Sequence, residues 1–499
     1  MDYKSIVEDF KNDKITIYDL VLLFDKGIDI KNKEEGVIYT PKYITDYIIN
    51  IINPDINEVI LEPSVGHGVF LFSLIEFIEK KYNLTGKEIK VWFEKNIIAN
   101  DINKKTIEEL KLILTVFFEK KGVMDVNFDN IFAADSLFHQ YEKFDLVIGN
   151  PPYIRTKNIE EGYLRKIREN FESCQSGNID IYYAFMEKFS KISKRFSFIV
   201  PNSYITNKSA KRLRGIIEDS LVSIVDFKEK LIFENARTYT SIFLIDNLNK
   251  KNHLEYSNDI NSSPILVNKE DINKEKWIFN NNIKKSIVSV EEMGELSFTS
   301  GIATLRDGVF IIKNPEEKNE YYIKIHEGIE YLIEKDVCID FYKITKPNER
   351  SVIIYPYSDG KIIPELEFSK KFPMAYQYLL EVKALLEKRD KGKTAKYDSW
   401  FAYGRRQGLN IVYNSYYLLV PIMTNGLLNI DIKNINEKFL IGSGFCIESS
   451  NVDLLNKIKE ELNSENFLNY LRAEGKAWPG KKTYYTLTSS QLREFINCE

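Results

Sequence analysis

The feature that most constrains this chain is the alternation of strand-like and helix-like runs between residues 55 and 245. Amphipathic patterns at 69–82, 103–121, 180–194 and 207–219 are typical of helices, and they separate several short apolar runs. Such alternation predicts an open α/β fold built on a mostly parallel sheet. The expected strands are EVILE, IKVWFE, NIFAAD, FDLVIGN, FSFIVP, VSIVDF and TSIFLID.

Length and composition narrow the class of protein. A chain of 499 residues is long enough for two to four domains, at about 150 residues each. Its sequence contains no uncharged apolar run of the roughly 18 residues that span a bilayer, and the start MDYKSIVEDFKNDK is too charged for a signal peptide. We therefore expect a cytoplasmic protein without a membrane partner.

The cysteines give no sign of a zinc site or a disulfide framework, because they lie far apart and form no CxxC pair. They are Cys174, Cys338, Cys446 and Cys498. No metal is expected.

The domain boundaries follow from a change of pattern. The Asn- and Lys-rich segment at 247–264 is the best candidate for a linker, and the regular alternation stops beyond it. We expect an N-terminal helical extension at 1–35, an α/β domain at 36–250, and a second domain at 265–499 made of mixed short strands and helices.

The stretch GNPPY ends one of the expected buried strands. Asn150 precedes Pro151, so its backbone is pushed toward an extended conformation, and each proline fixes its own φ near −65°. The Asn150 side chain and the following carbonyl group are therefore held rigidly. An ordinary turn from strand to loop is an equal alternative for these residues alone.

A second constellation suggests a nucleotide-like cofactor. Glu62 ends a strand, and Gly66 and Gly68 would let the backbone approach a ligand at the start of the next helix. Asp101 and Asp135 end the next two strands, where ligands bind in open α/β sheets. A carboxylate at the first of these positions commonly binds ribose hydroxyls, and one at the second could accept from an adenine amino group. His67, between the two glycines, is explained equally well as a ligand contact and as a surface turn residue.

Taken together, the ordered motifs resemble those of S-adenosylmethionine-dependent DNA adenine-N6 methyltransferases of the gamma arrangement. In that arrangement the cofactor motifs precede NPPY, and the target recognition domain comes last. The resemblance implies a Rossmann-like methyltransferase domain with a mostly parallel seven-stranded sheet, followed by a mixed α+β recognition domain. The matching segments are GVIYTPKYI (36–44), LEPSVGHG (61–68), NDI (100–102), ADSLF (134–138), GNPPY (149–153), NIDIYYAFMEK (178–188), FIVPNSYI (198–205) and FENARTYTSIFLI (233–245).

The resemblance also implies roles for single residues. Thr40 and Pro41 would touch the methionine part of the cofactor, and Phe185 would pack on its adenine ring. Ser64 stands where many relatives carry glycine, and a residue this small should fit. The implied cofactor set is Tyr39, Thr40, Pro41, Glu62, Ser64, Gly66, Gly68, Asp101, Ile102, Asp135, Ser136, Asn150 and Phe185.

The chemistry of adenine explains why NPPY would be needed. The exocyclic nitrogen is a poor nucleophile because its lone pair is delocalised into the ring. The Asn150 side-chain oxygen and the Pro151 carbonyl oxygen could accept both amino hydrogens and localise that lone pair. Tyr153 and Phe233 would stack on the two faces of a flipped-out base, although Phe233 taken alone fits a core aromatic better. The implied catalytic set is Asn150, Pro151, Pro152, Tyr153 and Phe233.

In the second domain, residues 383–406 combine basic and aromatic side chains. Phosphate neutralisation and base stacking need such residues, although a solvated helix followed by a buried aromatic strand is the simpler explanation. A formal net charge of −4 argues against coating nucleic acid by bulk electrostatics. The expected DNA-binding residues are Lys393, Lys396, Trp400, Tyr403, Arg405, Arg406, Lys476 and Lys481.

Other functions share parts of this pattern. NPPY-like motifs also occur in methyltransferases of RNA bases and of protein glutamine amides, and a non-catalytic specificity subunit could keep the fold. A fused restriction and modification enzyme is a third alternative, but the sequence contains no convincing acid-acid-lysine nuclease constellation. We expect a monomer that binds double-stranded DNA, with any restriction endonuclease encoded as a separate chain.

Overall fold

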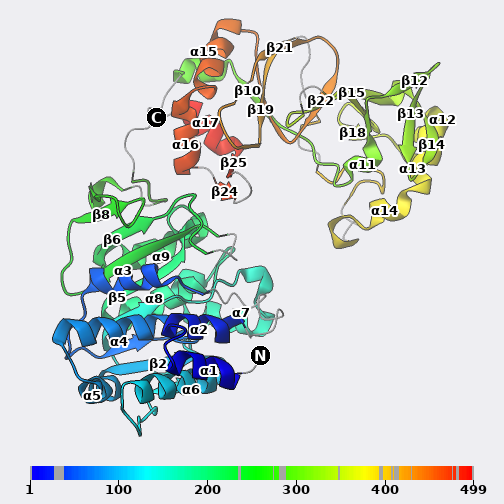
Figure 1. Cartoon of the computed structure of the whole chain (residues 1–499). Coiled ribbons are helices and arrows are strands. Elements are labelled where there is room, and N and C mark those ends of the chain that lie inside the picture. The colour runs from blue at the N-terminus through cyan, green and yellow to red at the C-terminus, as the bar shows by residue number, and fades with distance from the viewer. Residues whose placement is uncertain are drawn as a thin grey trace. The chain divides into compact units, whose positions relative to one another are not determined.

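The computed structural model divides the chain into two units, Met1–Phe279 and Asn280–Glu499, which are described separately (Figure 1). It describes residues 3–26, 39–233, 238–272, 275–279, 288–346, 349–392, 397–405, 408–409, 415–428, 430–474, 476–478 and 483–496. Within these residues no helix is both long enough and apolar enough to cross a membrane.

Unit 1 is built on a sheet whose strand order is β3-β2-β1-β4-β5-β7-β6-β8-β9. The strands β3, β2, β1, β4 and β5 run parallel to one another, whereas β7 is antiparallel to both β5 and β6. The predicted α/β fold is confirmed, although the sheet has nine strands and not the seven expected. The strands are β1 (Ile60–Glu62), β2 (Ile97–Asp101), β3 (Ile131–Ala133), β4 (Phe144–Gly149), β5 (Ser193–Pro201), β6 (Leu221–Asp226), β7 (Thr240–Asp246), β8 (His253–Ser257) and β9 (Ile265–Asn268).

Helices cover both faces of this sheet (Figure 1). Side chains alternate along β4, so Leu146 and Ile148 pack in one hydrophobic cluster and Val147 packs in the other. The first cluster is completed by α1 to α6 and the second by α7 to α9. The helices are α1 (Tyr3–Lys11), α2 (Ile17–Lys26), α3 (Lys42–Ile52), α4 (Val69–Tyr82), α5 (Gly86–Asn96), α6 (Lys104–Lys120), α7 (Glu161–Asn170), α8 (Tyr182–Ile192) and α9 (Lys211–Ile217).

One of the predicted strands is wrong. The run IKVWFE lies inside α5, and β2 is formed by the following residues, Ile97–Asp101. Thr85 and Glu88 form a reciprocal capping box that begins α5. Ile89, Trp92 and Phe93 are buried at helical spacing, while Val91 between them is 62% exposed. The spacing of the buried residues therefore follows the period of a helix and not that of a strand.

The predicted linker at 247–264 and the domain boundary drawn from it are also wrong. Strand β8 lies within this segment and pairs with β6, and β9, which follows the segment, pairs with β8. Leu254 is fully buried, and Trp277 is 1% exposed. Polar residues dominate the segment because it forms the outer strands and their turns, and the first unit ends at Phe279.

Unit 2 has the predicted mixed α+β architecture, with several small sheets. α12 to α14 pack in one hydrophobic cluster, and α15 to α17 pack in another. Its helices are α10 (Val290–Gly294), α11 (Asp307–Phe310), α12 (Glu365–Lys371), α13 (Pro373–Glu381), α14 (Lys383–Glu387), α15 (Val452–Leu462), α16 (Glu465–Glu474) and α17 (Ser489–Ile496). Its strands are β10 (Ser297–Ser300), β11 (Ile311–Lys313), β12 (Glu316–Lys318), β13 (Tyr321–His326), β14 (Ile329–Glu334), β15 (Cys338–Lys343), β16 (Ser351–Ile354), β17 (Tyr357–Ser358), β18 (Lys361–Ile362), β19 (Ser415–Pro421), β20 (Met423–Thr424), β21 (Ile432–Ile435), β22 (Phe439–Gly442), β23 (Gly444–Ser449), β24 (Lys476–Trp478) and β25 (Tyr484–Thr486).

The position of the unit boundary predicts how fragments behave. A fragment of residues 1–279 should unfold cooperatively, whereas a fragment of residues 1–250 lacks β8, β9 and Trp277 and exposes the edge of β6. Each large buried side chain removed costs about 2–5 kcal/mol, so the shorter fragment should melt at a lower temperature or aggregate. Equal melting temperatures would contradict the assignment of residues 251–279 to unit 1.

Candidate active site

The loop after β1 approaches the ends of two neighbouring strands. The Val65 amide donates to the Asn100 carbonyl oxygen at 3.0 Å, and the Gly66 amide donates to Asp101 Oδ2 at 3.1 Å. Both acceptors lie in β2, which pairs in parallel with β1. The backbone of the predicted cofactor turn is therefore attached to the carboxyl end of β2.

Glu62 offers a carboxylate beneath this turn. It is 4% exposed, and its buried Oε2 has no hydrogen-bond partner among the residues that the structure describes. Burial, together with the nearby charge of Asp101, raises the pKa of Glu62 well above its usual value. A ligand that brings a positive charge or an N–H group to this oxygen would relieve that cost, so Glu62 fits a cationic cofactor group.

The two glycines of the turn serve different purposes. Gly66 has φ +52°, and a Cβ built there meets nothing within 4 Å, so its open side could hold a ligand. Gly68 has φ +89°, and its Cβ would lie 2.8 Å from Leu110 Cδ1 on α6. Gly68 is therefore required by the packing of α4 on α6, whereas Gly66 borders open space.

Asp101 is tied to its own loop. Its Oδ1 accepts from the Asn103 amide at 2.9 Å, while Oδ2 accepts from Gly66. Burial raises the pKa of Asp101, and these N–H groups together with His67 oppose the shift. The neighbouring Ile102 side chain is 68% exposed. Asp101 therefore lies where a ribose-binding carboxylate is expected and also orders the glycine turn.

Asp135 follows β3 and is held by two donors. Tyr163 Oη donates to its Oδ2 at 3.0 Å, and the Leu137 amide donates to its Oδ1 at 3.0 Å. Ser136 is 4% exposed, and its hydroxyl donates to the Pro63 carbonyl while accepting from Asn100 Nδ2 at 2.7 Å. These bonds assign Ser136 the role of a brace between the first two cofactor loops.

Lys188 was not singled out in the sequence, although it belongs to a quoted motif. Its ammonium donates to the carbonyl oxygens of Ser136, Leu137 and His139 at 2.8, 3.0 and 2.7 Å. α8 thereby fixes the loop that carries Asp135. The same helix carries Phe185, which is 5% exposed and packs 5.9 Å from the Phe189 ring.

Three separate segments meet at Asn150. Its Nδ2 donates to Thr40 Oγ1 at 3.0 Å, and its backbone carbonyl accepts from Ser64 Oγ at 3.0 Å. Thr40 is 2% exposed and lies just before α3, while Ser64 lies in the loop after β1. The structure thus brings together the predicted residues from TPK, EPSVG and NPPY and fixes the orientation of the Asn150 amide.

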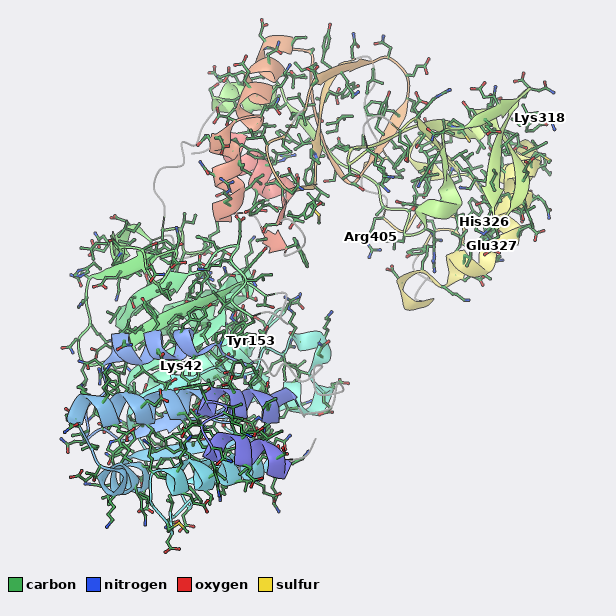
Figure 2. The ribbon with its side chains drawn as sticks, viewed as in Figure 1. Lys42, Tyr153, Lys318, His326, Glu327 and Arg405 are labelled. Atoms are coloured by element: carbon green, nitrogen blue, oxygen red, sulfur yellow. The ribbon has the colours of Figure 1, made fainter. Side chains whose placement is uncertain are left out.

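The predicted stacking pair is not formed in this structure. Tyr153 (Figure 2) donates its hydroxyl to the Ile199 carbonyl at 3.0 Å. Its ring centroid lies 6.3 Å from that of Phe233, and the two planes are inclined by 62°. Parallel faces would be needed to hold a planar base between them. Phe233 is 2% exposed and packs as a core aromatic, which was the alternative considered for it.

Asp180 was missed by sequence reasoning and lies beside the NPPY loop. Residues 154–156 pair with residues 179–181, through an Ile181 amide to Ile154 carbonyl bond of 3.0 Å and a bridge between Arg155 and Asp180. Burial raises the pKa of Asp180 to about 7, against the opposing charge of Arg155 and several backbone N–H groups. No apolar periodicity marks this residue, so only the neighbouring motif could have drawn attention to it.

The predicted DNA-binding residues of unit 2 meet different outcomes. Tyr403 is 1% exposed, and its hydroxyl donates to the Ile354 carbonyl at 2.5 Å, so its ring is a core residue and not a stacking surface. Trp400 is half-buried, with Nε1 donating to Glu365 at 2.9 Å. Arg405 (Figure 2) is exposed and pairs with Asp390 at 3.1 Å. Lys476 begins β24, and Lys393, Lys396, Arg406 and Lys481 lie outside the described residues.

The aromatic stretch is buried because one of the basic residues beside it is structural. Arg389 is 2% exposed, and its guanidinium donates to the carbonyl oxygens of Ala402 and Trp400 at 2.6 and 2.7 Å. A buried cation surrounded by backbone acceptors fastens the segment 400–402 to the end of α14. The aromatic side chains here are buried or half-buried, as the simpler explanation expected, but residues 400–402 form a turn and not a strand.

Comparison with known proteins adds an independent observation. Residues 71–233 match the family model described as Eco57I restriction-modification methylase. The resemblance to restriction-modification methyltransferases is confirmed. The chain is 25% identical over 387 residues to the type II restriction enzyme and methyltransferase RM.Eco57I of Escherichia coli, covering 66% of this chain and 37% of that protein. It is 29% identical over 230 residues to the type II methyltransferase M.HincII of Haemophilus influenzae, covering 43% and 39% respectively. The chain thus spans under two fifths of the length of these methyltransferases.

Two solved structures share the fold of this chain. The type IIL restriction-modification enzyme MmeI in complex with DNA aligns with a TM-score of 0.62 at 13% identity, over 95% of this chain and 69% of that one. The DrdV–DNA complex aligns with a TM-score of 0.53 at 12% identity, over 91% and 55%. These alignments support the α/β fold followed by an additional mixed domain.

The two glycines provide a paired test of the cofactor turn. Gly68→Ala combines a positive φ with a contact of 2.8 Å to Leu110, and we expect it to cost roughly 1–3 kcal/mol of unfolding free energy. Gly66→Ala meets open space and should cost less, while lowering cofactor affinity. Urea unfolding and calorimetry separate the two effects. An equal loss of stability in both variants would contradict the packing role of Gly68.

The raised pKa of Asp180 predicts a dependence of stability on pH. Because the folded-state pKa of about 7 exceeds the ordinary value of 3.8, the stabilising contribution of the protonated form is lost as pH rises through 7. Asp180→Asn should therefore gain stability relative to the wild type between pH 5 and pH 8.

For Asp145, burial is outweighed by Lys194 and the Val59 amide, and the pKa is lowered. Asp145→Asn should therefore be destabilised at pH 8, with the difference fading in acid. Urea unfolding of the three proteins at pH 3, pH 5 and pH 8 checks these signs, because Asp145 is protonated only below its ordinary pKa of 3.8. A pH-independent difference for Asp180→Asn would contradict the shift.

Proposed function

We propose that this chain is a DNA methyltransferase that transfers a methyl group from S-adenosylmethionine to N6 of adenine. The observation that carries the proposal is the junction of Asn150 with Thr40 and Ser64, at the carboxyl edge of the sheet and in the same edge as the cofactor turn. The matched methyltransferases are named as type II enzymes, and two of the aligned structures are titled as complexes with DNA. From this likeness we propose that the substrate is DNA and that the target base is adenine.

The residues present fit the proposed cofactor. When bound, S-adenosylmethionine supplies an electrophilic methyl group on a positively charged sulfonium. Glu62 offers a buried oxygen that no described residue hydrogen-bonds, and Gly66 borders open space. Asp101 and Asp135 would bind the ribose and the adenine through oxygens that already accept from the loop N–H groups and from Tyr163. A cationic ligand is the partner that such a carboxylate-rich edge favours.

Asn150 would prepare the nucleophile. Its Nδ2 donates to Thr40 Oγ1, and its side-chain oxygen is the acceptor end of the amide. Its side-chain oxygen and the Pro151 carbonyl oxygen would accept the two amino hydrogens of adenine and favour a tetrahedral nitrogen. The methylated nitrogen is acidic, so its proton leaves to solvent without a dedicated base. Preorganised acceptors of this kind act by stabilising the transition state.

The target base would have to leave the duplex, because adenine in DNA is stacked and paired. Flipping costs a few kcal/mol, and Tyr153 beside NPPY would stack on one face of the base. Since Phe233 packs at a steep angle to Tyr153 in this structure, its participation requires a shift of its ring on binding. Unit 2 would read the sequence, and exposed Arg405 keeps its proposed role at phosphates or guanine edges. We propose that a monomer acts on duplex DNA.

Replacement of Asn150 tests this proposal most sharply. Asn150→Ala should leave the affinities for S-adenosylmethionine and for DNA within a few-fold of wild type, because the residue acts on the reacting nitrogen. Turnover should fall by on the order of 10²–10³. Single-turnover methylation of an adenine-containing duplex, with separate binding titrations, measures each quantity.

A matched control is Asn96, a buried asparagine whose Nδ2 donates to the Glu58 carbonyl at 3.0 Å away from the site. Asn96→Ala should lower the melting temperature without a selective loss of turnover. Near-normal turnover by Asn150→Ala would show that NPPY is only a structural turn and would contradict the methyltransferase proposal. Methylation of RNA or of protein in place of duplex DNA would support the alternative substrates.

A further inference from the structure

His67 lies between the two glycines of the cofactor turn and is buried. Its side chain is 1% exposed, with Nε2 at 3.1 Å from Glu109 Oε2 on α6 and Nδ1 at 3.5 Å from Asp25 Oδ1 on α2. The two carboxylates are 15% and 23% exposed. The sequence-based explanation of His67 as a surface turn residue is therefore wrong. An imidazole between two carboxylates at these distances joins three segments far apart in the chain.

Helix α2, which supplies Asp25, packs against the rest of unit 1. Leu20, Val21 and Phe24 of α2 are at most 2% exposed and belong to the same hydrophobic cluster as α4 and α6. Tyr18 Oη donates to Glu76 on α4 at 2.9 Å. Because these contacts fix α2, the position of Asp25 is fixed with it.

The charge of Asp25 also influences Tyr39, which lies next to Thr40 in the chain. Burial raises the pKa of Tyr39, and the charges of Asp25 and Asp19 raise it further. Tyr39 directly precedes Thr40, whose hydroxyl accepts from Asn150. One helix outside the α/β motifs thus faces both the glycine turn and the segment that holds the catalytic amide.

The charges around His67 favour its protonated form. Burial lowers its pKa, but the hydrogen bond with Glu109 and the ion-pair contact with Asp25 outweigh burial and raise the pKa above the usual value. Asp101 adds a further negative charge that interacts with the imidazole. Lys105 opposes this group weakly, since its Nζ lies 3.6 Å from Glu109 Oε1 and its side chain is 69% exposed. The imidazole thus lies between the carboxylates of Asp25 and Glu109 and interacts with the charge of Asp101.

We propose that protonated His67, held by Asp25 and Glu109, is a positioning residue through which the N-terminal helix α2 fixes the cofactor turn for binding. This inference rests on the proposed function, because it concerns the affinity for S-adenosylmethionine. The contacts with Asp25 and Glu109 hold His67 in place, directly after Gly66, whose amide donates to Asp101. The brace is complete at low pH and is lost as pH rises through the folded-state pKa of His67, so cofactor affinity should fall there.

The test compares wild type with Asp25→Asn, which removes one charge from a residue outside the cofactor contacts. Calorimetric titration with S-adenosylmethionine between pH 6 and pH 9 gives the affinity of each protein. Comparison at each pH cancels the titration of the cofactor's own amino group, which has a pKa of about 7.7–8.0. We expect Asp25→Asn to bind roughly threefold to tenfold more weakly near neutral pH and to lose affinity at a lower pH than wild type.

Two further measurements make the result specific. NMR titration of the imidazole should show a lower His67 pKa in Asp25→Asn, without any cofactor present. Glu109→Gln should reproduce both effects, and it provides the answer if Asp25→Asn does not fold. Glu108→Gln is the matched control, because Glu108 is 65% exposed on the same helix and pairs with Lys104 at 4.0 Å; it should bind as wild type does.

The outcomes separate this inference from the proposed function. Absence of S-adenosylmethionine binding by wild type at every pH contradicts the proposed function and this inference with it. Normal wild-type binding that stays unchanged in Asp25→Asn and Glu109→Gln across the pH range overturns the inference alone. An unshifted imidazole pKa in both variants overturns it as well.

Discussion

The parallel pairing of β1 with β2 and β4 is the constraint on which the site depends. These pairs place Glu62, Asp101 and the start of NPPY at one edge of the sheet, because the carboxyl ends of parallel strands coincide. The loops that follow are then joined by hydrogen bonds, from Gly66 to Asp101 and from Ser64 to Asn150. Residues separated by up to 110 positions in the chain, such as Thr40 and Asn150, come into contact as a result.

Electrostatics at this edge gives it a preference for cationic ligands. Glu62 is buried and Asp101 half-buried, and desolvation raises the pKa of each. N–H groups offset this cost at Asp101, whereas Glu62 Oε2 has no hydrogen-bond partner in the part of the chain that the structure describes. His67 interacts with Asp101 and opposes the rise of its pKa. A positively charged cofactor would offset the remaining desolvation cost, so cofactor binding would stabilise the turn.

Sequence reasoning succeeded where local pattern and tertiary structure agree. The apolar runs of β4, β5 and β7 and the helical periodicity of α4 and α6 identified these elements, and the GxG turn and NPPY lie at the predicted strand ends. It failed where apolar residues fit two periods, as in IKVWFE, whose helix is decided by the Thr85–Glu88 capping box. It also failed at polar segments that pair in the sheet, such as residues 253–257. Asp180 and Lys188 were missed because their roles arise from contacts with distant loops, and Tyr403 was misjudged because the bonds of Arg389 that bury its segment are not encoded in local composition.

The proposed reaction is methyl transfer to N6 of adenine in DNA. It can be tested by expressing the chain in a bacterial host that lacks adenine methylation, digesting the DNA to nucleosides and quantifying N6-methyladenine by mass spectrometry, with Asn150→Ala expressed alongside. We expect N6-methyladenine in DNA from cells expressing the wild type and little or none with the variant. Absence of any methylated adenine with a folded wild-type protein that binds S-adenosylmethionine, or equal methylation by the variant, would contradict it.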